Sequence, residues 1–531
     1  MVKVLKRIRK GLVMKTLKVT GFILAGLELV VSIAAIYFAM STKMIPFVIG
    51  LIGAIILMAL PVVSFLLARK KSKKTRVASI ILSTFMCVIM AVACYFLSVT
   101  SRAIDNVTGT TVEVDEINVY VSKDDEVSSI NEAVTNNYVF GVISTDDTKH
   151  IDDTISKIEK DIDVTIQTQE YESVYALIGA FEEGIIQSFI TNEGTILALD
   201  NSEDYMDYSK NLKVIMENTI KEKLKEEVKQ EVDKDAFCVY FSGIDSFGSV
   251  TVRSRSDVNI IGVVNNKTKT VLLVSTPRDY FVEIAGTNGK KDKLTHAGIY
   301  GIDVSMETLE MLYNTDISYY VRINFSGFQD IIDTLGGVDV YSEHDFVSET
   351  EEGTYSYTEG VNHLNGEEAL GFARARYAFI DGDRQRGRNQ MQVIKATIEK
   401  LESPETLKNY ANLMDSMSGS FQTDMTKDNI GYLVQSTLDD GNWKILTYSV
   451  SGSDAEEVCY SLGAEAYVMQ PNQADVTYGN ELISRVLGGE VLTQEEINKY
   501  IENKDNEDKI TEQSVEETTE EGDSDSESSD E

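Results

Sequence analysis

Arginine side chains gather at two places in a chain that is otherwise strongly acidic. The first group holds Arg253, Arg255 and Arg278, and the second holds Arg374, Arg376, Arg384, Arg386 and Arg388. A guanidinium group is a planar fork of N–H donors that matches two oxygens of a phosphate. A local run of arginines is also typical of a solvated surface, so the spacing of the residues has to decide between the two interpretations.

The spacing favours shared faces. Arg255 and Asp257 are two residues apart beside an apolar strand pattern, and alternate residues of a strand share a face. Arg374 and Arg376 have the same spacing at the end of a helical pattern. Each pair can therefore aim its polar groups in one direction.

The remaining polar residues have compatible positions. Asp383, Arg386 and Gln390 are spaced i, i+3 and i+7, which places them on one face of a helix. Arg278 follows Pro277, whose fixed φ and missing N–H suit the exit of a strand. The side chains of these segments are predicted to bind a phosphate group.

Two aspartates could bind a metal ion. Asp245 and Asp257 each lie at an edge of an apolar strand run. Mg²⁺ prefers one or two carboxylates together with waters and substrate phosphates, so the pair fits a metal-bridged pyrophosphate. Taken separately, each is also a common turn or cap residue. The four histidines and four cysteines form no zinc pattern, and neither a P-loop nor a nucleophile elbow is present.

Charge divides the chain into a basic head and an acidic body. The 531 residues carry 85 acidic and 49 basic side chains, for a net charge of −36, which argues against nucleic-acid binding by bulk charge. Residues 1–76 nevertheless hold fourteen basic side chains against the single acid Glu28. That acid either faces a neighbouring helix or marks a functional site.

The head contains three apolar runs, Val19–Met40, Met44–Ala68 and Val77–Val99. Each is long enough to cross a bilayer, which takes about 20 residues as a helix, and three runs disfavour a cleaved signal peptide. Basic residues lie in 1–18 and in 69–76, so the positive-inside rule places both segments in the cytoplasm. We therefore expect a multi-pass protein of the cell membrane, with everything after about residue 100 outside.

The body is predicted to be α/β. Residues 112–230 read as a small accessory α/β domain with strands at Glu116–Ser122 and Asn137–Ile143 and a charged helix over Lys210–Asp233. Residues 235–490 mix β-rich and helical segments, as in a layered α/β domain. The acidic segment 500–531 is expected to be disordered. Cys238 and Cys459 lie outside the membrane runs, either as a disulfide or as two buried thiols.

A resemblance carries the interpretation further. The motifs that carry it follow one another in order: Gly243-Ile244-Asp245, Arg255-Ser256-Asp257, Ser275-Thr276-Pro277-Arg278-Asp279, Lys293-Leu294-Thr295-His296-Ala297, Phe325-Ser326-Gly327-Phe328, Leu335-Gly336-Gly337-Val338-Asp339-Val340, His363-Leu364-Asn365-Gly366, Arg374-Ala375-Arg376 and Gly382-Asp383 with Arg386 and Gln390. Over about residues 235–405 the chain resembles the LytR–CpsA–Psr family of cell-wall glycopolymer ligases. The membrane runs and accessory segment resemble its capsule-type branch.

The resemblance implies a reaction and a site. Family members move a glycopolymer from a polyprenyl-pyrophosphate carrier to peptidoglycan through a phosphodiester bond, in a Mg²⁺-dependent reaction. It implies an α/β/α catalytic domain with an apolar groove for the polyprenyl tail. The implied metal ligands are Asp245 and Asp257, Asp383 is a further catalytic acid, and the implied pyrophosphate ligands are Arg255, Arg278, Arg374, Arg376, Arg386 and Gln390.

Three alternatives to a ligase stay open. A pyrophosphatase would use the same residues with water as the acceptor. A non-catalytic protein of wall assembly would need none of them for chemistry. A transcription regulator conflicts with the expected position of residues 100–531 outside the cell.

Overall fold

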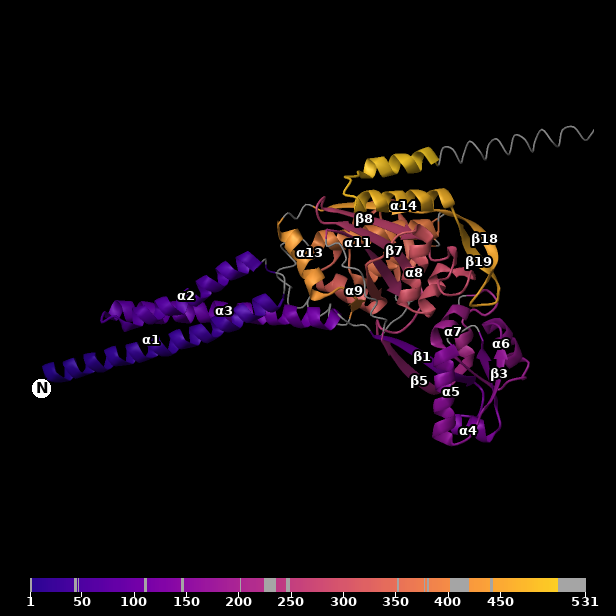
Figure 1. The fold of residues 1–531 in the computed structure, drawn as a ribbon, viewed down its shortest axis with the longest axis horizontal. Helices are drawn as coiled ribbons and strands as arrows, with labels where there is room; N and C mark the ends of the chain where they lie inside the picture. Colours follow the sequence, from indigo (N-terminus) through magenta and orange to yellow (C-terminus); the bar gives the residue numbers. More distant parts are fainter. Residues whose placement is uncertain are drawn as a thin grey trace, which may run out of the picture.

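Figure 1 shows a computed structural model in which three long helices project from the side of a folded body. The description covers residues 2–504 except 43–44, 46, 109–111, 145–147, 201, 224–234, 245–248, 351–352, 377, 380–381, 402–419 and 440–442. Most of the acidic tail, residues 505–531, lies outside it. Residues 494–504 are helical, so regular structure continues past the start expected for that tail.

The projecting helices are α1 (Val2–Ser41), α2 (Phe47–Arg69) and α3 (Lys73–Val107). All three are long and apolar enough to cross a membrane. Glu28 of α1 is buried and faces α3, where its Oε2 accepts a 2.6 Å hydrogen bond from Ser83. Arg76, in the first turn of α3, donates to the carbonyl of Met14, which links the basic segment 69–76 to the basic start of α1. The basic segments therefore lie at one end of the bundle.

The accessory unit is built on a five-stranded sheet in the order β3-β2-β4-β1-β5. Its core is formed by alternate apolar residues of the strands packed against α5, α6 and α7. The elements are β1 (Val112–Ser122), α4 (Ile130–Thr135), β2 (Val139–Ile143), α5 (Thr148–Ile162), β3 (Gln167–Tyr171), α6 (Val174–Glu182), β4 (Ser188–Asn192), α7 (Glu193–Leu199), a 3₁₀ turn η1 (Tyr208–Asn211) and β5 (Leu212–Lys223).

The helix predicted over Lys210–Asp233 is wrong, because Leu212–Lys223 is strand β5. β5 pairs antiparallel with β1 along its length, from Val112–Lys223 to Ser122–Leu212. From Met216 onward one set of alternate side chains is buried or half-buried and the other set is exposed, which is the period of two of a strand. The many charged residues made this segment resemble a solvated helix. Pairing with a neighbouring strand overrode local propensity, and residues 224–233 lie outside the description.

The larger domain contains a six-stranded mixed sheet in the order β16-β11-β6-β7-β8-β17. β6 runs antiparallel to β7, β7 antiparallel to β8, and β8 parallel to β17. The strands are β6 (Ala236–Ile244), β7 (Ser256–Asn265), β8 (Thr270–Thr276), β11 (Tyr319–Asn324), β16 (Phe421–Thr423) and β17 (Lys444–Ser449). β6, β7, β8 and β11 contain the strands that the sequence predicts at Ala236–Ser242, Val258–Val264, Thr270–Ser275 and Tyr319–Ile323.

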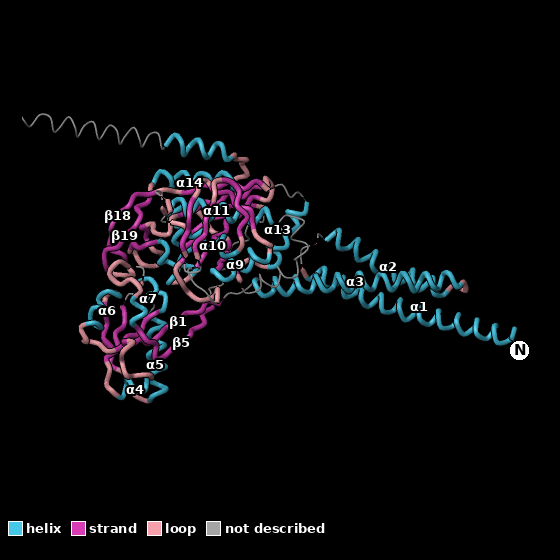
Figure 2. Tube along the Cα trace, turned by 180° about the vertical axis from the view of Figure 1, so that it is seen from behind, coloured by secondary structure: helices cyan, strands magenta, loops and turns pink. Residues whose placement is uncertain are grey.

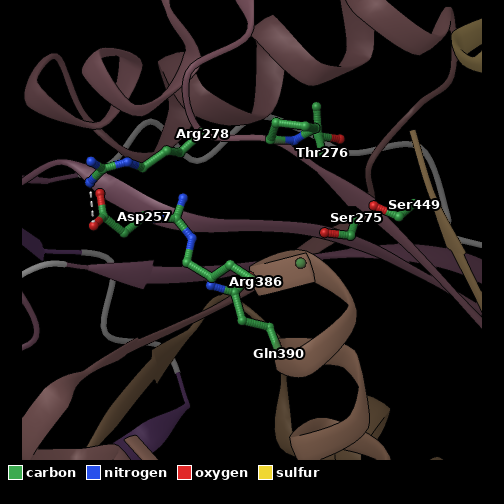
Figure 3. Close-up of a pocket in the computed structure, with 9 residues that line it drawn as sticks. Asp257, Ser275, Thr276, Arg278, Arg386, Gln390 and Ser449 are labelled. Carbon is green, nitrogen blue, oxygen red and sulfur yellow. Dashed lines mark hydrogen bonds and ion pairs between the residues drawn. The ribbon is translucent and has the colours of Figure 1, made fainter. Parts of the chain in front are cut away.

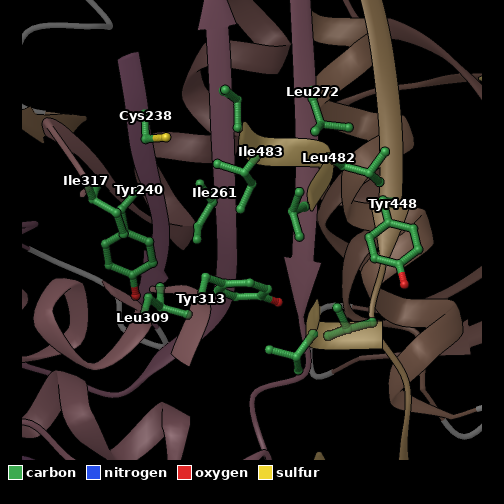
Figure 4. Close-up of a cluster of buried hydrophobic side chains, with 14 of the residues drawn as sticks. Cys238, Tyr240, Ile261, Leu272, Leu309, Tyr313, Ile317, Tyr448, Leu482 and Ile483 are labelled. Carbon is green, nitrogen blue, oxygen red and sulfur yellow. The ribbon is translucent and has the colours of Figure 1, made fainter. Parts of the chain in front are cut away.

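Helices cover both faces of this sheet, so the domain is an α/β/α sandwich. On one face, Tyr240, Ile261 and Leu272 pack against α8 (Ile302–Tyr313) and α14 (Gln473–Leu487), as Figure 4 shows. The opposite face packs against α11 (Asp383–Leu401) and α13 (Lys427–Asp439). Both faces are apolar because each strand alternates its side chains between two covering layers.

Smaller elements complete the larger domain. A lobe beside α11 consists of α9 (Phe325–Thr334), α10 (Gly366–Arg374) and two β-ribbons. Its ribbon strands are β12 (Val338–Ser342), β13 (Phe346–Glu349), β14 (Thr354–Tyr357) and β15 (Gly360–Leu364). Elsewhere lie β9 (Phe281–Glu283), β10 (Lys291–Lys293), the 3₁₀ turn η2 (Leu294–Ile299), β18 (Gly452–Cys459) and β19 (Ala464–Pro471). Cys238 and Cys459 are buried free thiols in separate apolar clusters.

Candidate functional site

One edge of the six-stranded sheet brings the distant polar segments together. β8 and β17 are parallel and end side by side at Ser275 and Ser449. β7 is antiparallel to β8, so its first residues, including Asp257, lie beside the end of β8. Ligands of α/β proteins commonly bind beyond the carboxyl ends of such strands.

Asp257 is held among positive charges at this edge. Its Oδ2 accepts a 2.7 Å hydrogen bond from Nη1 of Arg278, and its Oδ1 accepts a 3.1 Å bond from the Thr295 hydroxyl. Burial opposes ionisation of the carboxyl, but the guanidinium groups of Arg278, Arg255 and Arg386 outweigh it and hold the pKa of Asp257 well below its usual range. The carboxylate is therefore ionised at neutral pH.

Helix α11 supplies the opposite wall of a small pocket. Arg386 and Gln390 are buried and lie one turn apart, and Figure 3 shows Arg386 extending toward Asp257. The pocket is lined by Asp257, Ser275, Thr276, Pro277, Arg278, Arg386, Gly387, Gln390 and Ser449. Both arginine groups of the sequence thus contribute to the same cavity, the first through Arg278 and the second through Arg386.

Gly387 lets α11 approach the sheet. A Cβ at this position would lie 2.7 Å from Oγ of Ser275 and 3.5 Å from Oγ of Ser449. A larger residue would push the first turn of α11, with Arg386, away from the strand ends. The glycine therefore sets the depth of the pocket.

Asp279 is a functional candidate that the sequence prediction missed. It is buried, and its Oδ2 lies 3.5 Å from Nε of Arg278 and 3.5 Å from Nη2 of Arg376. Its Oδ1 lies 3.8 Å from Nζ of Lys293. Burial opposes ionisation here too, yet these cations lower the pKa of Asp279. The available signal was its position directly after Arg278 in the Ser275–Asp279 motif.

Of the other predicted site residues, two lie at the site, one is exposed, and the side chains of two are not described. Arg255 is buried next to Asp257, and Arg376 joins the site through Asp279. Arg374 is exposed and stacks with its Cζ 4.5 Å above the ring of Phe325. Asp245 follows β6 but lies outside the described residues, and Asp383 is the first residue of α11 with a side chain that is not described.

Three further arginines of the two groups point elsewhere. Arg253 pairs with acids of the accessory unit. Arg384 donates to the carbonyl of Gly452 at 3.3 Å, and Nε of Arg388 lies 3.3 Å from Oε2 of Glu343. Spacing alone could not separate Arg384 and Arg388 from Arg386, because all three lie in the first turns of α11, nor Arg253 from Arg255, two residues further on.

The donor set at the strand edge is compatible with a hard divalent cation. Asp257 is an ionised oxygen ligand beside the Thr295 hydroxyl. Within the described residues there is no group of three or more His, Cys, Asp or Glu side chains that could hold a metal ion. Because water and phosphate oxygens can complete the shell of Mg²⁺, a single described carboxylate such as Asp257 can be one of its ligands.

The arrangement defines a class of protein: an α/β/α domain attached to three apolar helices, with guanidinium groups that converge in a pocket at the strand ends. Residues 205–480 match the model of the LytR_cpsA_psr family, and the chain belongs to this family.

Two curated relatives carry the name polyisoprenyl-teichoic acid–peptidoglycan teichoic acid transferase TagU. The Bacillus cereus protein is 37% identical over 187 residues, which are 35% of this chain and 59% of the relative. The Enterococcus faecalis protein is 34% identical over 228 residues, 43% of this chain and 73% of the relative. The crystal structure of Bacillus subtilis TagV is 28% identical with a TM-score of 0.40, covering 49% of this chain and 100% of TagV.

Proposed function

We propose that this protein transfers a glycopolymer from a polyprenyl-pyrophosphate carrier to a hydroxyl of peptidoglycan. The hydroxyl oxygen attacks the phosphorus that bears the polymer and forms a new P–O bond. The P–O bond to the bridging oxygen breaks, polyprenyl monophosphate leaves, and the hydroxyl proton passes to a base or to water. The product is a phosphodiester between polymer and wall.

The convergence of Arg278 and Arg386 with Asp257 in one pocket carries this proposal. Phosphoryl transfer requires mainly positioning and stabilisation of charge on the phosphate oxygens. The names of the relatives, which describe polyisoprenyl-linked teichoic acid as donor and peptidoglycan as acceptor, support the same reaction.

We assign roles according to position. Arg255, Arg278, Arg386 and Gln390 bind the pyrophosphate, and Arg376 joins them from the side of Asp279. Arg374 is proposed as a further pyrophosphate ligand, reached by rotation away from Phe325. Asp383, at the start of α11, either receives the hydroxyl proton or orients arginines.

Mg²⁺ is proposed as the cofactor, held by Asp257 and Asp245 together with oxygens of the bound pyrophosphate. When bound, it would neutralise charge on those oxygens. The ionised state of Asp257 supports this assignment.

The proposed location is the cell membrane, with residues 1–18 and the loop 69–76 in the cytoplasm and the catalytic domain outside. The shared end of the two basic segments supports this orientation through the positive-inside rule. A lipid-linked donor then meets the site next to the bilayer. The polymer is a teichoic-acid-like or capsular glycopolymer, and comparing wall composition with and without the protein would identify it.

Transfer can be tested with the full chain in lipid vesicles. A lipid-pyrophosphate oligosaccharide, peptidoglycan fragments and Mg²⁺ are mixed, and linked product and released polyprenyl phosphate are measured with and without a chelator. Arg386→Ala should lower the rate by about 100-fold or more. Arg388→Ala, on the same helix but paired with Glu343, is the matched control and should change it little.

Each alternative predicts a different product. Release of polyprenyl phosphate at the same rate without peptidoglycan would show a pyrophosphatase. Absence of linked product with the unmodified protein, together with normal wall polymer in cells carrying Arg386→Ala, would show a non-catalytic role.

A further inference from the structure

The hairpin formed by β18 and β19 links the accessory unit to the arginine site. The two strands pair antiparallel from Gly452–Pro471 to Cys459–Ala464. Figures 1 and 2, from opposite sides, show them running along the flank of the larger domain toward α6 and α7. The sequence of residues 112–223 contains no recognised catalytic motif, so the contacts of the accessory unit with this hairpin indicate what the unit does.

The tip of the hairpin is inserted into the accessory unit. Leu462 and Val468 belong to the same buried cluster as Leu177 and Ile178 of α6. The backbone N–H of Tyr175 donates to the carbonyl of Leu462 at 3.3 Å. The tip therefore shares the accessory core.

Gly463 makes this docking possible. Its φ of +69° is in the left-handed region, and an added Cβ would lie 2.1 Å from Cβ of Ser173. Any other residue here would be strained and would also separate the hairpin from the start of α6.

The same hairpin touches the site at three points. The ring of Tyr467 lies 5.8 Å from Cζ of Arg376, within the range of a cation–π contact. The backbone N–H of Met469 donates to the carbonyl of Asp279 at 2.7 Å. The carbonyl of Gly452 accepts from Arg384, two residues before Arg386.

The Tyr467 ring is fixed on its own hairpin. Its hydroxyl donates to Oδ1 of Asp454 at 2.9 Å. Burial and this hydrogen bond raise the pKa of Tyr467 to about 12, so the hydroxyl remains a donor at neutral pH. Val468, the next residue, is fully buried in the accessory cluster.

We propose that the β18–β19 hairpin is a positioning arm through which the accessory unit sets the orientation of Arg376, with Tyr467 as the positioning residue. The inference rests on the proposed function of the arginine site. Arg376 is about a quarter exposed, at 23%, and its guanidinium contacts Asp279 on one side and the Tyr467 ring. Asp279 is itself bound to the arm by its backbone, so a shift of the hairpin moves both partners.

The first test compares Tyr467→Leu with Tyr467→Phe in the full chain. If the ring positions Arg376, Tyr467→Leu should raise KM for the lipid-pyrophosphate donor by about threefold to tenfold with kcat nearly unchanged. Tyr467→Phe keeps the ring and should restore KM to within about twofold. Equal KM values for Tyr467→Leu and the unmodified protein, or a Phe variant as poor as the Leu variant, would overturn the assignment.

The second test perturbs only the docked tip. Gly463→Ala should raise KM in the same way, while Gly184→Ala should not. Gly184 has a φ of +72°, but nothing lies within 4 Å of an added Cβ, so it reproduces the backbone strain without the clash. Hydrogen exchange of β18 and β19 reports whether the tip has been released. A released hairpin with an unchanged KM would overturn the role of the accessory unit.

Binding separates this inference from the proposed function. Farnesyl pyrophosphate is titrated against the same variants, and its affinity does not depend on transfer to peptidoglycan. If the unmodified protein binds this probe but links no polymer, the proposed function fails while the arm is still tested by the Tyr467 and Gly463 variants. If transfer occurs and these variants bind and react normally, the arm alone fails.

Discussion

Two opposing effects meet at the Asp257 carboxyl. Removal from water disfavours its charged form, and three guanidinium groups favour it. The cations prevail because they lie close by in a partly desolvated edge, where charge interactions are stronger than in water. The aspartate in turn limits the repulsion among the arginines, which allows them to converge before a phosphate is bound.

Asp257→Asn should therefore destabilise the fold at pH 7 by about 1–3 kcal/mol, because Arg278 loses a charged acceptor. A carboxyl whose pKa is lowered by folding stabilises the folded state above its unfolded-state pKa, which is about 4. This stabilisation is lost as the pH falls through the folded-state pKa. The difference between the two proteins should shrink between about pH 4 and pH 2. Urea unfolding across this range measures it, with Asp339→Asn, on the exposed pair with His363, as control.

Gly387→Ala should reduce both stability and transfer, since its Cβ would meet Ser275 Oγ at 2.7 Å. Overpacking of this kind costs about 1–3 kcal/mol. The double variant Ser275→Ala, Gly387→Ala removes the obstructing oxygen and should recover most of the loss. Thermal unfolding and transfer rate are the measurements, and a double variant no better than the single would contradict this explanation.

At the scale of elements, strand β1 serves two units. It pairs with β4 and β5 inside the accessory sheet. Val114 of the same strand also exchanges backbone hydrogen bonds of 2.9 Å with Thr251 and Arg253 of the larger domain. Because one backbone carries both sets of bonds, the accessory sheet cannot rotate freely against the catalytic domain.

A carboxyl pair connects β1 to α7 and should make the accessory unit sensitive to pH. A hydrogen bond to Glu116, burial and the charge of Glu116 raise the pKa of Glu193 to about 7. A carboxyl whose pKa is raised by folding stabilises the folded state fully below its unfolded-state pKa, which is about 4.3 for glutamate. This stabilisation is lost as the pH rises through the folded-state pKa of about 7. The hydrogen-exchange protection factors of β1 and β4, which are corrected for the intrinsic rise of exchange with pH, should therefore fall between pH 5 and pH 8.

Glu193→Gln should remove most of that pH dependence and stabilise the accessory unit at pH 8 by about 1 kcal/mol, a value reduced for solvent screening at this half-buried site. Glu183→Gln, at the C-cap of α6, is a matched control and should leave the dependence intact. A Glu193→Gln variant with the pH profile of the unmodified protein would contradict the explanation that a proton held between Glu193 and Glu116 causes the pH dependence.

At the scale of the whole molecule, a buried ion network joins the two units. Arg253 contacts Glu113 at 3.1 Å, Asp115 at 3.4 Å and Glu222 at 2.9 Å, all on strands of the accessory sheet. The buried Arg322 reaches Glu113 from the other side at 2.5 Å. Acids of one domain thus depend on cations of the other.

Arg253→Met should destabilise the protein by up to about 3–5 kcal/mol, because it removes a cation shared by the buried carboxylates of Glu113 and Asp115. Arg485→Met provides the control: that arginine also contacts three carboxylates, but these are about half exposed, and the loss should be about 1 kcal/mol or less. Urea unfolding of the full chain in detergent compares the two. Equal losses would show that the network contributes no more than a surface cluster.

Local patterns in the sequence were sufficient for much of the fold. Apolar length alone indicated the three membrane helices, and β-rich apolar runs marked β6, β7 and β8. The pattern failed at β5, where alternating charges resembled a helix and pairing with β1 decided the outcome. It also stopped short at residue 500, beyond which Lys504 binds Asp475.

The chemistry of the site was present in the sequence as residue types and short spacings, and four of the predicted residues, Asp257, Arg278, Arg386 and Gln390, line one pocket. Which arginine faces the pocket was decided only by tertiary structure, since Arg386 and Arg388 lie two residues apart on the same helix but only Arg386 lines the pocket. The same holds for Asp279 and Tyr467, whose partners are remote in sequence. Spacing within a segment fixes the face on which a side chain lies, whereas the partner on that face depends on how distant segments pack.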